Sequence, residues 1–89
     1  MSTYIKDPQA VLDYGFDWSD WLQDGETITT STWTLDTGLS KTSDSHDGSA
    51  TTIWLSGGTA DEDYSITNHI KTSANREDDR SHKIKVRER

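Results

Sequence analysis

The stretch from Ile53 to Asn68, IWLSGGTADEDYSITN, limits the fold of this chain more than any other part of it. A short apolar run ends at Gly57 and Gly58, and two glycines can supply the positive φ angles that a sharp reversal of the chain needs. After the acidic residues 61–63, an alternating run begins in which Tyr64, Ile66, Asn68 and Ile70 share one side of the chain. The stretch therefore predicts a strand, a turn and a second strand.

Tyr64 is the first aromatic residue after this turn. In immunoglobulin-type sandwiches a tyrosine at this place packs its ring into the core, and its hydroxyl binds backbone a few residues upstream. We therefore assign structural roles to Tyr64, Gly57 and Gly58.

Short alternating segments also occur along the rest of the chain. Trp18 and Trp33 lie on the apolar sides of two of them, so we assign both to the core. A bulge near Ile28 would bring Ile28 and Trp33 to the same face. The predicted strands are 10–18, 27–35, 39–45, 50–55, 64–71 and 82–87, with a helical turn or bend at 18–22 and an exposed loop at 72–81. This pattern predicts an all-β chain folded as a single small Ig-like antiparallel β-sandwich of about six or seven strands.

The length of 89 residues fits one domain with a small core. Residues 1–8 are polar and show no periodicity, so we expect an N-terminal arm there and the Ig-like sandwich over 9–89. No apolar run approaches the ~20 residues of a membrane span. The chain has no cysteine, which excludes disulfides and zinc–thiolate sites.

The formal net charge is −7, and it is unevenly distributed. Residues 1–75 carry 3 basic and 12 acidic side chains, whereas residues 76–89 carry 6 basic and 4 acidic ones. Phosphate contacts by Lys and Arg supply most nonspecific affinity for nucleic acid, so nucleic acid is not an expected partner. A basic end on an acidic body favours head-to-tail or docking contacts between proteins.

No motif for chemistry occurs in the sequence. His46, His69 and His82 match no metal-ligand spacing, and three consecutive acidic residues on a turn cannot all face one ion. No serine lies in a G-x-S-x-G motif. We therefore expect no catalytic residue, no metal and no cofactor.

Two tryptophans are candidates for binding a partner. Trp54 lies between Ile53 and Leu55, so if these two face inward it faces outward and can serve as an anchor; the opposite register, with Trp54 inside, remains open. Trp21 lies on the bend after the first sandwich strand. Exposed aromatic rings on a sandwich could also stack on sugars, so a carbohydrate-binding module is an alternative.

Four segments resemble small structural proteins of tailed phages known as fiber-tail adaptor proteins. They are DYGFDWSDWL (13–22), ITTSTWTLDTGL (28–39), IWLSGGTADEDYSITNHIKT (53–72) and the C-terminal segment that ends in DDRSHKIKVRER. The first and third are the most specific, and together the four span nearly the whole chain in the same order.

The resemblance implies a non-enzymatic virion protein that joins other structural proteins in the head-to-tail or tail-fibre region, in several copies or as a homo-oligomeric ring. It would assemble in the host cytoplasm, without nucleic acid or membrane as partner. We expect partner proteins to contact Asp20, Trp21, Trp54, Arg80 and Arg87. A capsid decoration protein of the same fold is the other alternative.

Overall fold

The apolar and polar alternation of the sequence forms seven strands. A computed structural model describes residues 2–88. The strands are β1 (Ser2–Lys6), β2 (Leu12–Asp17), β3 (Ile28–Leu35), β4 (Leu39–His46), β5 (Ala50–Gly57), β6 (Asp63–Thr72) and β7 (Glu77–Val86). The prediction of an all-β fold with six or seven strands is confirmed.

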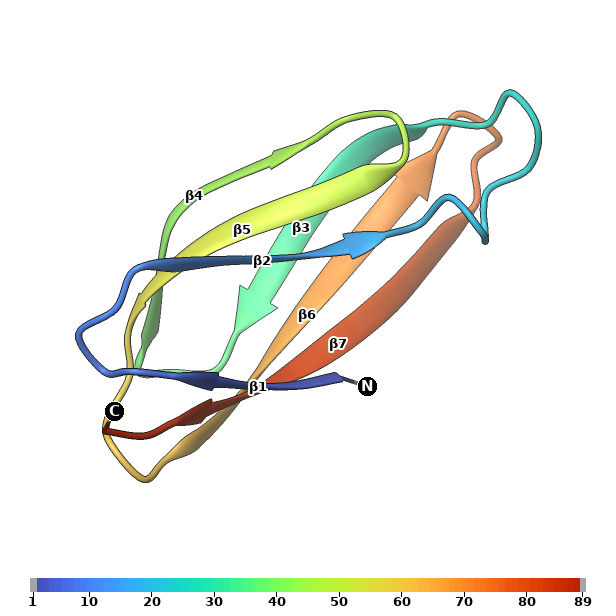
Figure 1. Cartoon of the computed structure of the whole chain (residues 1–89). Coiled ribbons are helices and arrows are strands. Elements are labelled where there is room, and N and C mark those ends of the chain that lie inside the picture. The colour runs from blue at the N-terminus through green and yellow to red at the C-terminus, as the bar shows by residue number, and fades with distance from the viewer. Residues whose placement is uncertain (1, 89) are drawn as a thin grey trace.

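The strands form two sheets that pack face to face (Figure 1). One sheet has the order β1-β7-β6-β3, and the other has the order β2-β5-β4. In immunoglobulin-type sandwiches strands B, E and D share one sheet, and strands C, F and G share the other. Here β2, β5 and β4 take the places of B, E and D, and β3, β6 and β7 take those of C, F and G. One pair departs from the antiparallel prediction, because β1 runs parallel to β7.

Two apolar clusters fill the space between the sheets. The larger one contains Tyr64 and the fully buried Ile53, Leu55 and Ile84, with Trp33 packed against its margin. The smaller one lies at the other end of the sandwich, around Trp18, which has no exposed surface. The core positions predicted for Trp18 and Tyr64 are thus occupied, and Trp33 is half-buried.

The turn after β5 has the predicted geometry. Gly57 and Gly58 have φ angles of 81° and 96°. A Cβ on Gly58 would also lie 2.7 Å from a methyl carbon of Val86, so the close approach of β7 excludes a side chain there. The Tyr64 hydroxyl accepts a hydrogen bond from the backbone N–H of Thr59 at 2.9 Å, as a tyrosine corner requires.

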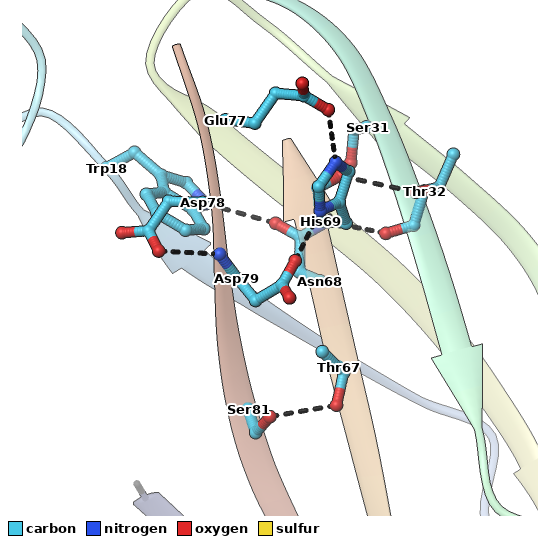
Figure 2. A network of polar contacts seen from close by, with 10 residues as sticks. All are labelled: Trp18, Ser31, Thr32, Thr67, Asn68, His69, Glu77, Asp78, Asp79 and Ser81. Carbon is cyan, nitrogen blue, oxygen red and sulfur yellow. Dashed lines mark hydrogen bonds and ion pairs between the residues drawn. The ribbon is translucent and has the colours of Figure 1, made fainter. Parts of the chain in front are cut away.

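Asn68 connects the two sheets between these clusters (Figure 2). It lies on β6 and is fully buried. Its Oδ1 accepts hydrogen bonds from Trp18 Nε1 (3.1 Å) and from the Thr51 hydroxyl on β5 (2.7 Å). Its Nδ2 donates to the Ser31 hydroxyl (2.9 Å) and to the carbonyl oxygen of Thr32 (3.1 Å), both on β3. The amide therefore satisfies all its hydrogen-bonding groups with residues from both sheets.

Two expectations for the ends of the chain are corrected. Residues 2–6, expected within a free arm, form β1 along β7, and Lys6 is fully buried. The Lys6 ammonium donates to the carbonyl oxygen of Gly57 at 2.7 Å, which holds this strand to the glycine turn. The predicted loop over 72–81 is also too long, because β7 already begins at Glu77. In contrast, the bulge predicted near Ile28 is present between Ile28 and Thr30.

We expect Tyr64→Phe to lower the free energy of unfolding by about 1 to 2 kcal/mol, because the Thr59 N–H loses its acceptor. Urea denaturation would measure this difference. Tyr14→Phe is the matched control, since the buried Tyr14 hydroxyl has no hydrogen-bond partner among residues 2–88. Equal stability losses in the two variants would contradict a role for the Tyr64 hydrogen bond.

Asn68→Ala should lower the free energy of unfolding by about 3 kcal/mol or more, because several buried donors lose their partner at once. Thr67→Ala, on the next position of β6, removes only a half-buried hydroxyl pair with Ser81 and should cost under about 1 kcal/mol. Chemical denaturation of both variants tests this difference. A similar small loss in both would show that Asn68 does not join the sheets.

Candidate functional site

The predicted helical turn after β2 is present. The backbone N–H groups of Trp21 and Leu22 both donate to the carbonyl oxygen of Trp18, at 2.9 and 3.1 Å. This turn brings the Trp18 and Trp21 rings to 5.6 Å in an edge-to-face arrangement. Trp18 is buried and Trp21 half-buried, so the turn closes this end of the sandwich.

Arg76 covers the ring of Trp21. Its guanidinium carbon lies 4.0 Å from the ring centroid, and Nη2 donates to the Trp21 carbonyl oxygen at 3.1 Å. Two further bonds, of 2.9 and 2.5 Å, join the guanidinium to the buried Glu26 carboxylate, which also accepts from Thr72. The hydrogen bonds from Arg76 are the main reason that the pKa of Glu26 falls to about 2. Trp21 is therefore held in place by contacts within the chain.

Arg80 covers the ring of Trp18 in a similar way. Its guanidinium carbon is 4.2 Å from the Trp18 ring, and Nη1 donates to the Asp17 carbonyl oxygen at 3.1 Å. Asp20 lies exposed in the same turn. The structure thus brings three predicted docking residues, Asp20, Trp21 and Arg80, to one end of the sandwich.

Trp54 lies away from this end, on the outer face of the β2-β5-β4 sheet. Its neighbours in β5, Ile53 and Leu55, have no exposed surface, whereas Trp54 is 41% exposed. The outward register is therefore the one observed. Asp13 of β2 and Ser43 of β4 lie directly opposite Trp54 in the two flanking strands.

Arg87 directly follows the last residue of β7, whereas Arg80 lies near the start of this strand. Its Nη2 pairs with Asp63 at 3.1 Å, and Lys83 approaches the same carboxylate at 3.9 Å. The five predicted docking residues thus occupy three separate places. Which of them contact a partner stays a prediction.

The three histidines lie on different strands. The ring of His69 lies between Glu77 and Asp79 on the outer face of the four-stranded sheet, and these carboxylates raise its pKa (Figure 2). The buried His82 ring stacks on Phe16 at 3.8 Å and donates to the Gly15 carbonyl oxygen at 2.9 Å. Burial lowers the pKa of His82, so it packs as a neutral ring.

No set of three or more His, Cys, Asp or Glu residues within 2–88 is arranged to hold a metal ion. The same residues contain no helix long and apolar enough to cross a membrane.

The sequence patterns missed the polar residues that organise the interior. Glu26, Arg76, Asn68 and Lys6 were not singled out, although each holds a loop or strand in place. Asn68 alone had a signal, because it shares the apolar side of its strand with Tyr64. Arg76, which pairs with Glu26, and Gly57, which accepts from Lys6, each lie about 50 residues from their partner, and no local pattern indicates these contacts.

The fold and these contacts define a small β-sandwich protein whose described polar clusters secure its own loops. Residues 6–85 match the family described as podophage GP4 fiber-tail adaptor protein gp77. The match covers most of the chain, so the chain belongs to this family, and the resemblance seen in the sequence motifs is confirmed. The family description is that of a phage structural component. A comparison with curated proteins gave no match.

Glu26→Gln should unfold at a lower temperature than the wild type at pH 7. The lowered pKa means that the folded state favours the carboxylate, so this stabilisation is present above pH 4.5 and is lost as the pH falls towards about 2. Melting curves across this pH range should show that the wild type and Glu26→Gln become more similar in melting temperature as the pH is lowered. Glu62→Gln, an exposed control, should track the wild type throughout. A difference in melting temperature that does not change with pH would contradict stabilisation by the ionised Glu26 carboxylate.

Proposed function

We propose that the protein is a non-enzymatic structural adaptor of a phage virion, in the head-to-tail or tail-fibre region, where it docks other structural proteins. The observation that carries this proposal is the family match over residues 6–85. It assembles in the host cytoplasm and becomes part of the particle. Its partners are proteins rather than nucleic acid or membrane.

The architecture supports docking between proteins. β1 and β3 border one sheet, and β2 and β4 border the other. The outer side of an edge strand carries backbone N–H and C=O groups that can pair with a strand of a neighbour. A small sandwich with four such edges offers several surfaces for contacts in a multi-protein particle.

The charge distribution supports several copies in contact. The segment 76–89 carries 6 basic side chains, whereas the rest of the chain is strongly acidic. Opposite charges on separate parts of one molecule favour heterologous contacts, which close into rings when the rotation between copies allows it. We therefore propose a homo-oligomeric ring or multiple copies in the virion.

Immunogold labelling of intact virions, with copy number from quantitative mass spectrometry, tests the location. The expected result is label confined to the tail vertex and few copies per particle. Label over the whole capsid shell, with many copies per particle, would contradict the adaptor role and indicate a capsid decoration protein. Binding of purified protein to a glycan array, lost in Trp54→Ala, would instead support a carbohydrate-binding module.

A further inference from the structure

Two of the four tryptophans carry an arginine of the same chain on the ring. Arg76 lies 4.0 Å from the Trp21 ring and Arg80 lies 4.2 Å from the Trp18 ring. In both cases an oxygen beside the ring fixes the guanidinium: the Glu26 carboxylate for Arg76 and a backbone carbonyl for Arg80. An aromatic face with an adjacent oxygen is thus the arrangement that holds Arg76 and Arg80, two of the three described arginines.

Trp54 presents the same two components on the outer face of the β2-β5-β4 sheet. Asp13 lies directly opposite Trp54 in the adjacent strand, and both side chains are exposed. Directly opposed residues in antiparallel strands have Cβ atoms about 4.5 to 5.5 Å apart, so one guanidinium can reach the ring and the carboxylate together. The next outward position of β2 is Gly15, opposite Thr52, so no side chain stands there.

Within residues 2–88 no cation lies over the Trp54 ring, and the Asp13 carboxylate makes no ion pair. The three strands of this sheet contain a single lysine, Lys41, and its ammonium pairs with Asp44 at 2.6 Å. The described arginines are also engaged: two lie on tryptophans, and Arg87 pairs with Asp63. Since the arginines described in this chain already have partners, an arginine for Trp54 is expected from a different protein.

We propose that Trp54 and Asp13 form a docking site for an arginine on an extended segment of another virion protein. The guanidinium stacks on the indole and pairs with the carboxylate, while Asp17, further along the outward side of β2, adds negative charge to the same face. A planar guanidinium suits this site better than the compact ammonium of lysine. The inference rests on the adaptor function proposed above and specifies one surface for it.

The test is a titration of the ¹⁵N-labelled full chain with acetylated tetra-arginine amide, followed through the indole N–H signal of Trp54. A saturable shift of this signal is expected, and tetra-lysine amide should bind at least about threefold more weakly. Asp13→Asn should also weaken binding at least about threefold, whereas Asp24→Asn, in the β2–β3 turn, should not. In Trp54→Ala the shifts of the surrounding backbone amides should be lost.

Several results would overturn the proposal. The Trp54 signal could remain unmoved, or Asp13→Asn and Asp24→Asn could weaken binding equally, which would show attraction by net charge alone. A Trp54 signal that moves on dilution of the protein by itself would assign the face to a second copy. A saturable shift with cellohexaose and none with tetra-arginine would assign it to carbohydrate. None of these outcomes changes where the protein lies in the virion, so failure of this site and failure of the adaptor function are distinguishable.

Discussion

The buried amide of Asn68 is the contact on which the rest of the structure depends. Through this amide, β3 and β6 of one sheet are hydrogen-bonded to Thr51 of the other sheet and to Trp18, which directly follows β2. Apolar contacts alone permit two sheets to pack at several offsets, because burial is not directional. An amide in a low-dielectric interior accepts only the arrangement that satisfies it, since a buried group without a partner is costly. Asn68 thus selects one alignment of the sheets.

The position of Trp18 and Trp21 at the end of the sandwich follows from this alignment. Because Asn68 fixes the Trp18 indole, the following turn starts from a defined position and places Trp21 against Trp18. Arg76 and Arg80 then cover the two rings from the β6–β7 hairpin and from β7. Each of the two rings at this end therefore already has a partner within the chain. Trp54 lies outside this chain of contacts.

The sequence could predict the elements whose signal is local. Alternation narrowed Trp54 to two registers, of which the outward one is observed, and the conflict in side between Ile28 and Trp33 indicated a bulge. Gly57 and Gly58 indicated the corner. The sequence could not predict β1, because this polar segment becomes a strand only through parallel pairing with β7, some 80 positions away. The pairing of Arg76 with Trp21 is equally non-local, so an anchor role for Trp21 was the simplest reading of an exposed bend.

The composition of the interior explains why this fold suits an assembly component. Among the described residues, 11 apolar side chains are buried together with 6 polar or charged ones, including Lys6, Glu26 and His82. A small sandwich buries only about 60% of the surface of its unfolded chain, and polar groups in the core add specificity more than stability. Because its core is small and partly polar, the fold depends for its stability on each apolar residue that it buries. Trp54 is the largest apolar side chain left more than a third exposed, so its area remains available for stabilisation by a neighbouring protein.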